Sequence, residues 1–351
     1  DVQAGTLSTL AGLGFAWTDV TVEGAAVGEA WNGGVTLSGV SAAEATIRAR
    51  GDATVDGSGF GTLSLTALGD ATLRDVNGGT LVVFAGRDFG GEGGSASVLS
   101  EGEAIGEGTA ILARVSAEAA EVTAAADARV RDSGFGRLAM QAGRDGVAAG
   151  VTAGRLESVA ARDLSWTDVS ADVAVGEATA GSAQIARLEA GEARLAAGLD
   201  LGVTDSALGR FEGTAGRDLS LARVATQMAT AAAGRDLSAV DVEAGSAGFA
   251  SGRDMMVRRL AGETLTLDAD GALSATSLSA ATATLAAGRR LDGARIRAGA
   301  LEAQSGGAMT LADLTHGSAS LAAGGTLSLA RAQGGALTAT AASAVLSDLA
   351  V

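Results

Sequence analysis

The sequence contains no proline, cysteine or tyrosine, and only 3% of its 351 residues are aromatic. Proline lacks an amide donor and is excluded from central strands, so its absence is expected where the backbone is paired continuously. A chain without cysteine can cross an oxidising compartment without being cross-linked, although cytosolic chains can lack cysteine too. Because Ala and 53 Gly residues supply much of the 47% hydrophobic content, the chain is too apolar for disorder but lacks the large side chains of an ordinary compact core.

Lysine is also absent, so all 25 basic residues are arginine, against 41 acidic residues and a net charge of −16. This balance argues against a nucleic-acid groove, which needs clustered basic residues, and against binding to anionic membranes. No segment approaches the roughly 20 consecutive apolar residues of a membrane span. The chain begins with Asp and has no basic and apolar leader, so we expect a mature chain or an internal fragment.

The strongest signal is an internal repeat of eighteen residues. Steps of eighteen from Leu201 meet an aliphatic side chain every time, at Leu219, Leu237, Met255, Leu273, Leu291, Met309, Leu327 and Val345. Three weaker apolar columns keep the same period, starting at Leu195, Val203 and Ser206. A period of this kind is the signature of a solenoid, in which equivalent positions stack on one another.

The phase of the repeat is kept upstream with slips. Asp88 and Asp145 are 57 residues apart, which is three periods with three extra residues. We place the extra residues in 90–108, where a Gly- and Glu-rich sequence predicts a loop. The sequence therefore predicts one continuous domain over 1–351, with irregular coils in 1–190 and regular coils in 191–351.

Larger blocks are duplicated as well. Trp17-Thr18-Asp19-Val20, leading to Val27-Gly28-Glu29-Ala30, returns as Trp166-Thr167-Asp168-Val169, leading to Val175-Gly176-Glu177-Ala178. The chain grew by copying sets of several repeats.

Within each repeat, pairs such as Leu219-Ser-Leu221 alternate with the period of a strand, and Gly and Asp separate them. Each unit is predicted to contain about three short strands joined by tight turns, which makes one coil of a parallel β-helix. Coils stack about 4.8 Å apart, so about nineteen coils would form a rod of roughly 90 Å. A left-handed β-helix also uses eighteen residues per coil, but its third aliphatic column would fall on Arg297 and Gln333. We therefore favour the right-handed form.

Stretches such as Ala215-Gly-Arg-Asp-Leu-Ser-Leu221, Leu285-Ala-Ala-Gly-Arg-Arg-Leu291 and Gly325-Thr-Leu-Ser-Leu329 resemble the repeats of filamentous-haemagglutinin-type exoproteins. The resemblance covers most of the chain from about Gly134 onward. It implies a right-handed parallel β-helix in a large bacterial adhesin, which leaves the cell through an outer-membrane secretion partner. Glycine-, alanine- and leucine-rich solenoids of autotransporters and surface layers share much of the pattern.

Arg217-Asp218, Arg235-Asp236 and Arg253-Asp254 are the most regular candidates for a binding site. Stacked coils would align them in rows at one corner, where planar arginine donors could bind an anion or a carbohydrate. The alternative, which we favour, is a structural turn in which each aspartate caps local backbone amides, as in an Asx-turn.

Other candidates are weaker. Trp17 and Trp166 could stack on a sugar or, as is more usual, fill the core. Five glutamates could ligate calcium or lie in a solvated loop: Glu29, Glu101, Glu103, Glu107 and Glu177. We expect His316, the only histidine, to be a surface turn residue, and we expect no metal, cofactor or catalytic set.

Two classes of function remain. We favour a non-enzymatic structural or adhesive rod, secreted or at the bacterial cell surface, over a carbohydrate-active β-helix enzyme. Its expected partners are a host or neighbouring-cell surface, glycans or its own copies, which could stack end to end because neither end of the sequence shows a polar cap. Neither nucleic acid nor an inserted membrane is an expected partner.

Overall fold

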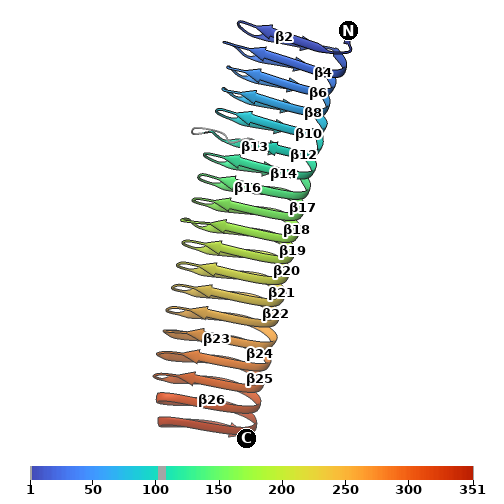
Figure 1. The fold of residues 1–351 in the computed structure, drawn as a ribbon. Helices are drawn as coiled ribbons and strands as arrows, with labels where there is room; N and C mark the ends of the chain where they lie inside the picture. The colour runs from blue at the N-terminus through green and yellow to red at the C-terminus, as the bar shows by residue number, and fades with distance from the viewer. Residues whose placement is uncertain (1, 102–107, 351) are drawn as a thin grey trace. The chain divides into compact units, whose positions relative to one another are not determined.

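The computed structural model describes residues 2–101 and 108–350. These residues are all-β, without helix, and form a parallel β-solenoid whose coils repeat about every eighteen residues, as the sequence predicts (Figure 1). The right-handed sense stays a prediction. The chain divides into two compact units, Asp1–Thr179 and Ala180–Val351, close to the position where the repeat becomes regular.

In the first unit, most coils contain one strand of four residues and one of nine, until longer strands begin at β17. The strands are β1 (Val2–Ala4), β2 (Leu7–Ala11), β3 (Phe15–Thr18), β4 (Val20–Ala30), β5 (Val35–Ser38), β6 (Ser41–Ala49), β7 (Ala53–Asp56), β8 (Gly59–Ala67), β9 (Ala71–Arg74), β10 (Asn77–Ala85), β11 (Phe89–Glu92), β12 (Ser95–Glu101), β13 (Ala110–Ala113), β14 (Ser116–Ala124), β15 (Ala128–Arg131), β16 (Gly134–Ala142), β17 (Gly146–Ala160) and β18 (Leu164–Ala178).

In the second unit, most coils contain a single strand of fifteen or sixteen residues. The strands are β19 (Ala183–Ala197), β20 (Leu201–Ala215), β21 (Leu219–Ala233), β22 (Leu237–Ser251), β23 (Met255–Ala269), β24 (Ala272–Ala287), β25 (Arg290–Ser305) and β26 (Met309–Ala350). The expectation of three separate short strands was therefore wrong. Two of the three corners of a coil turn the chain while the backbone stays paired with the neighbouring coils.

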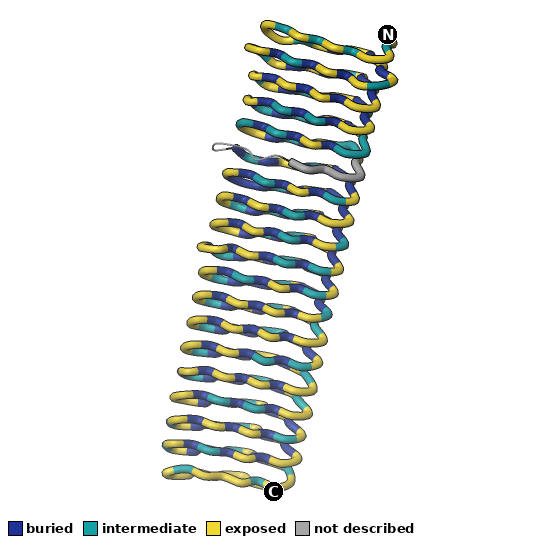
Figure 2. The backbone as a smooth tube through the Cα atoms, viewed as in Figure 1, coloured by how far each residue is buried: buried dark blue, intermediate teal, exposed yellow. Residues whose placement is uncertain are grey.

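Each coil nevertheless has three runs of inward side chains. In the coil that begins at β20 the inward positions are Leu201, Val203, Ser206, Leu208, Phe211, Gly213 and Ala215, and adjacent outward or part-buried positions mark the corners between the runs (Figure 2). Register joins each position to the one eighteen residues later, as in Leu201 with Leu219 and Phe211 with Ala229. Every inward column is therefore continuous from coil to coil.

The strongest predicted column is confirmed from Leu201 to Leu327, whose members are all buried. Val345 is the exception, because its side chain is 62% exposed. The preceding bends lie at Asp313 and Arg331, but the last lies at Asp348, one residue earlier than the period requires. Residues 342–350 are all exposed, so Val345 shares its exposure with the neighbouring residues of the last coil.

The three extra residues are also where the sequence places them. Val83 pairs with Glu101 at a separation of eighteen, whereas Phe89 pairs with Ala110 at a separation of 21, so the extra length lies between Glu101 and Ala110. The prediction of a loop over all of 90–108 was wrong, because β11 and β12 occupy much of it and pair with coils on both sides.

Candidate functional site

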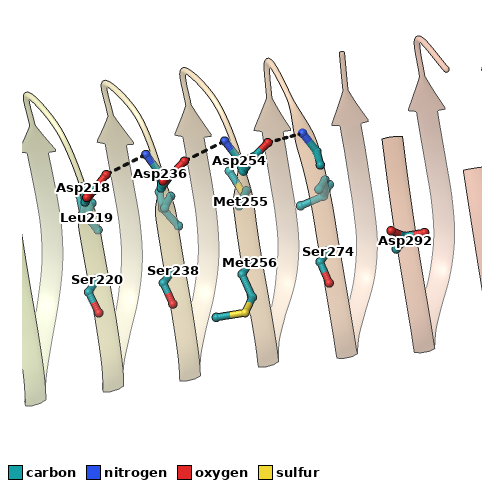
Figure 3. A pocket seen from close by; sticks show the side chains of 13 residues that line it. Asp218, Leu219, Ser220, Asp236, Ser238, Asp254, Met255, Met256, Ser274 and Asp292 are labelled. Carbon is teal, nitrogen blue, oxygen red and sulfur yellow. Dashed lines mark hydrogen bonds between the residues drawn. The ribbon is translucent and has the colours of Figure 1, made fainter. Parts of the chain in front are cut away.

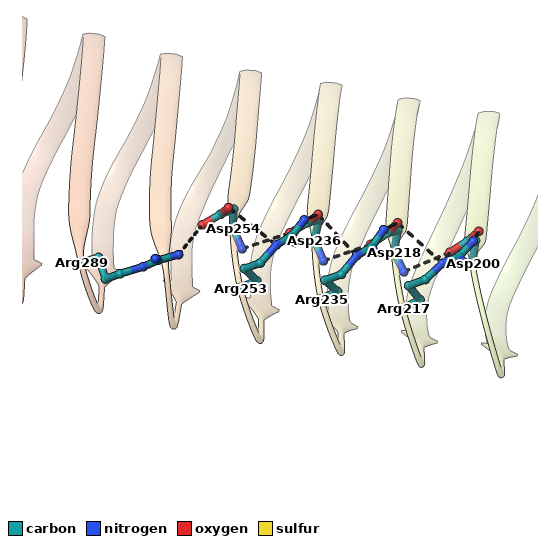
Figure 4. Close-up of polar contacts among 8 residues, drawn as sticks. All are labelled: Asp200, Arg217, Asp218, Arg235, Asp236, Arg253, Asp254 and Arg289. Atoms are coloured by element: carbon teal, nitrogen blue, oxygen red, sulfur yellow. Dashed lines mark hydrogen bonds and ion pairs between the residues drawn. The ribbon is translucent and has the colours of Figure 1, made fainter.

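The Gly-Arg-Asp corner forms a row of ion pairs, which we call the corner ladder: Asp200, Arg217, Asp218, Arg235, Asp236, Arg253, Asp254 and Arg289 (Figure 4). Arg217 donates from Nε to Asp200 Oδ1 over 2.7 Å and from Nη2 to Oδ2 of the same carboxylate. Arg235 and Arg253 bind Asp218 and Asp236 in the same forked way. The guanidinium of one coil thus binds the carboxylate of the coil before it.

Three arginines of the ladder, Arg217, Arg235 and Arg253, also lie close to the aspartate that follows each of them in sequence. Arg217 Nε is 3.8 Å from Asp218 Oδ2, and Arg235 Nε is 3.6 Å from Asp236 Oδ2. These arginines therefore lie between two carboxylates. The predicted anion-binding row at Arg217, Arg235 and Arg253 is neutralised from within the chain, which favours the structural alternative.

That structural alternative was wrong in one detail. The amide that each aspartate caps belongs to the next coil: Asp218 N donates to Asp200 Oδ1, and Asp236 N donates to Asp218 Oδ1, each over 3.3 Å. Neighbouring coils lie only about 4.8 Å apart, so a carboxylate can reach the amide above it. The corner therefore holds coils together and is not a set of independent Asx-turns.

The charge pairing shifts the titration of these groups. The forked hydrogen bond from Arg217 lowers the pKa of the Asp200 carboxyl, and Arg253 does the same to the pKa of Asp236. Hydrogen bonding to Asp200 and Asp236 raises the pKa of Arg217 and Arg253 in turn. Both partners stay charged across the physiological range.

A second row of charges, which the sequence analysis missed, lies at the first bend of each coil. This bend ladder consists of Asp205, Arg223, Asp241, Arg259, Ser277, Arg295, Asp313 and Arg331. All eight residues have φ between 52° and 59°, in the left-handed region that most side chains avoid. The sequence signal is an alternation of Asp and Arg with a period of 36 residues, which is visible only when pairs of coils are compared.

Three arginines of the bend ladder bind the aspartate of the preceding coil through both Nε and Nη2: Arg223 binds Asp205, Arg259 binds Asp241, and Arg331 binds Asp313. The guanidinium hydrogen bonds lower the pKa of these three aspartates. These rungs join coils in pairs, whereas the corner ladder joins successive coils from Asp200 to Arg253. At the forked rungs of both ladders the arginine is paired with an aspartate of the preceding coil.

Between the two ladders, a groove of about 510 Å³ runs along the short face of the coils. Figure 3 shows Ser220, Ser238, Met256 and Ser274 side by side on successive strands, below the aspartates of the corner ladder. Small side chains at this outward column create the groove. Its walls are the coil backbones and carboxylates that already accept amide hydrogen bonds.

Both candidate tryptophans belong to the core. Trp166 is fully buried, and Trp17 is 6% exposed with its indole Nε1 donating to Thr9 Oγ1 over 3.0 Å. Neither can stack on a sugar, so the binding role was wrong and the core role is confirmed. In the duplicated block, a Cβ at Gly176 would lie 2.9 Å from Trp166 Cη2, so glycine there makes room for the indole.

His316 is buried at 4% exposure, and the prediction of a surface turn residue was wrong. It occupies an inward column in register with Ala298, and a Cβ at Gly334 would lie 2.8 Å from its Nδ1. The small neighbours in its column leave room for the ring. Neither ring nitrogen has a hydrogen-bond partner among the described residues, and burial lowers the pKa of the imidazole.

Of the glutamates considered for calcium, Glu103 and Glu107 lie outside the described residues. Glu177 accepts a hydrogen bond from Thr179 Oγ1 over 3.3 Å. Within 2–101 and 108–350, no group of three potential ligands gathers to hold a metal ion. The same residues include no helix with the length and apolarity needed to cross a bilayer.

No known protein family, curated protein or solved structure matches this chain.

Proposed function

We propose that this chain is a repeat segment of a non-enzymatic structural or adhesive rod, secreted or displayed at the bacterial cell surface. The observation that carries the proposal is that arginines and aspartates of the second unit pair with one another between coils. At the corner ladder, guanidinium forks bind the carboxylates of the preceding coil, so the arginines hold successive coils together.

The way in which a solenoid grows supports the same conclusion. Each coil contacts only its neighbours, so a chain of this kind gains length by adding coils and needs no new core. The outward column at Ser220, Ser238 and Ser274 carries small side chains, and Met256 in the same column is the one large side chain among them. The resemblance to filamentous-haemagglutinin-type repeats, and with it the expected outer-membrane secretion partner, agrees with an extracellular spacer or adhesive segment.

The test uses beads coated with the 351-residue chain, placed in flow over a layer of bacterial or epithelial cells. Beads coated with serum albumin are the control. In parallel, the soluble chain is incubated with a panel of acidic and neutral polysaccharides, and new reducing ends are measured.

We expect the coated beads to be retained above the albumin control and the polysaccharides to remain intact. Reducing ends that increase with protein concentration would contradict the proposal in favour of a carbohydrate-active enzyme. Beads that wash off as readily as the albumin beads would contradict the adhesive role.

A further inference from the structure

The bend ladder has one irregular rung. Asp205, Asp241 and Asp313 are the acceptors of three rungs, and the alternation of Asp and Arg requires a fourth aspartate at position 277. The residue there is Ser277, whose backbone has the same left-handed conformation, with φ of 59°. The fold of the bend is kept while the negative charge is lost.

Arg295, the arginine of this rung, is consequently underused. It donates from Nε to Ser277 Oγ over 3.0 Å, and no second hydrogen bond from its guanidinium reaches any described residue. Its equivalents at the other rungs use both Nε and Nη2 on one carboxylate. Arg295 therefore keeps free donors and has no carboxylate in the preceding coil, and the Asp313 carboxylate of the next coil, which its charge also influences, is already bound by Arg331.

A second unpaired arginine lies beside it. Arg297 is two residues further along the same strand, on the same outward side, and makes no hydrogen bond or ion pair to the described part of the chain. Register places it between Ser279 and Thr315 of the adjacent coils. Two guanidinium groups and two hydroxyl groups thus share one strip of surface.

This strip is hollowed. A groove of about 400 Å³ is lined by Ser277, Ser279, Arg295, Arg297 and Thr315, together with the paired Asp313 and Arg331. Three arginines against one aspartate give its charged lining an excess of positive charge, although the chain as a whole carries −16.

The adjoining groove, of about 460 Å³, provides an internal comparison, because it shares Ser277 and Ser279 with the first. Its charged lining consists of Arg223, Arg259, Asp241 and Glu243, in which the charges balance. The excess of positive charge is therefore local to the coils on one side of Ser277.

We propose that the groove at Arg295 and Arg297 binds a carboxylate group of an acidic ligand, in the place that an aspartate takes at the other rungs. The planar guanidinium of Arg295 donates to both oxygens of the ligand carboxylate, in the way that Arg223 and Arg259 donate to their aspartates. Arg297 supplies the second positive charge, and Ser279 and Thr315 supply neutral hydrogen-bonding groups. This site is independent of whether the chain is adhesive.

The proposal is tested by titrating the 351-residue chain with citrate at low ionic strength, by calorimetry and by the nitrogen-15 shifts of the arginine Nε groups. Sulfate at matched ionic strength is the comparison anion. We expect citrate to shift Arg295 and Arg297 selectively and to bind more tightly than sulfate. Arg295→Gln and Arg297→Gln should each weaken citrate binding by about tenfold, because a charge-assisted contact is lost.

The sharpest variant is Ser277→Asp, which completes the ladder from within. Asp tolerates the left-handed conformation, so the coil should fold, and its carboxylate should occupy Arg295 and abolish most citrate binding. Ser277→Asn is the neutral control of the same shape and should bind citrate within about twofold of the parent. Arg223→Gln, in the balanced groove, should leave citrate binding unchanged.

Three results would overturn the site: no measurable citrate binding by the parent chain, equal citrate binding by the Asp and Asn variants at position 277, or sulfate binding as tightly as citrate. Circular dichroism of each variant separates loss of binding from loss of folding.

Discussion

At the first bend of the coil, the two units differ in the residue that follows an aspartate one coil later. Among the described residues of the first unit, three of the four aspartates with positive φ are followed at the next bend by glycine: Asp19 by Gly39, Asp75 by Gly93 and Asp132 by Gly150. In the second unit, aspartates are followed by arginine. All of these residues have positive φ, so the backbone conformation is the same and only the partner of the carboxylate has changed.

The close contacts explain the pairing with glycine. A Cβ at Gly150 would lie 2.7 Å from Asp132 Oδ1, and one at Gly93 would lie 2.2 Å from Asp75 Oδ1. There the carboxylate occupies the space of the next side chain, whereas in the second unit it turns to meet a guanidinium. The left-handed bend is therefore the constant feature of this solenoid. The side chains at the bend vary, and they form an ion-pair ladder in most of the second unit and the proposed binding position at Arg295.

The largest expected effect tests what the two units share. Leu164 in the first unit and Leu219 in the second each begin a long strand, β18 and β21, with an inward side chain that is 1% exposed. Replacing either by Ala should lower the free energy of unfolding by about 2–5 kcal/mol, because a buried methyl cluster is lost and a cavity remains. Urea unfolding measures both, with Ser220→Ala as the outward control, expected within about 0.5 kcal/mol of the parent. A loss in only one unit would show that the two cores are not equivalent.

The second prediction concerns the bends themselves. Gly150→Ala should cost about 1–2 kcal/mol, because a Cβ in the left-handed region is strained and here also meets the Asp132 carboxylate. Arg223→Ala should cost at most about 1 kcal/mol, since Arg223 already has a Cβ in this conformation and loses only an exposed ion pair. The same urea experiment checks both variants, and the reverse order would remove the distinction between the units.

The third prediction concerns His316. Burial lowers its folded pKa below the ordinary value of 6.5, so the unfolded chain binds the proton more readily. Its contribution to stability is therefore complete above pH 6.5 and is lost as the pH falls through the folded pKa. His316→Leu should remove this dependence of unfolding free energy on pH between 7 and 5. A parent chain whose stability is constant over that interval would contradict the burial of a neutral ring.

The smallest effect is expected in the ladders. Asp236 has a lowered pKa in the folded chain because Arg253 binds it, so its stabilisation is present above the unfolded value of 3.8 and is lost as the pH falls below it. Asp236→Asn should therefore flatten the loss of stability between pH 5 and 3, while an unpaired Arg253 costs little at the surface. Melting temperatures across this pH range provide the test, and an acid response identical to the parent's would exclude a contribution from this rung.

The sequence predicted the period, the parallel stacking and the columns that start at Leu201 and Val203, because large aliphatic side chains recur there often enough to be seen. It did not reveal the inward columns that include Ala229, Ala233 and Ala247, since alanine is equally common on both faces of these strands. Ser58 and Ser133 were also unrecognisable as buried, and Ser206 was placed only as the polar start of a predicted apolar column. Each accepts a hydrogen bond from an amide of the preceding coil and donates to a carbonyl two residues earlier, and these partners are evident only in three dimensions.

For the charged residues too, only the pattern between sequence neighbours could be predicted. The corner ladder was predicted because Arg and Asp are adjacent in sequence, whereas the bend ladder was missed because its partners are eighteen residues apart and alternate over 36. His316 was harder still, since its burial depends on small residues in neighbouring coils, such as Ala298 beside the imidazole. The core role of Trp166 was predicted, but not that Gly176 of the same strand makes room for its indole.

The central claim is that residues eighteen apart are stacked in register on adjacent coils. The chain contains no cysteine, so introduced pairs report on geometry without interference. Ser220 is in register with Ser238, and Ser238 with Met256, so Ser220→Cys with Ser238→Cys places two thiols one coil apart, and Ser220→Cys with Met256→Cys places them two coils apart. A disulfide requires Cα atoms within about 7 Å, which one coil spacing of about 4.8 Å satisfies and two do not. We expect rapid intramolecular cross-linking of the first pair under mild oxidation and none of the second; cross-linking of the second pair, or failure of the first, would contradict the stacked eighteen-residue coil.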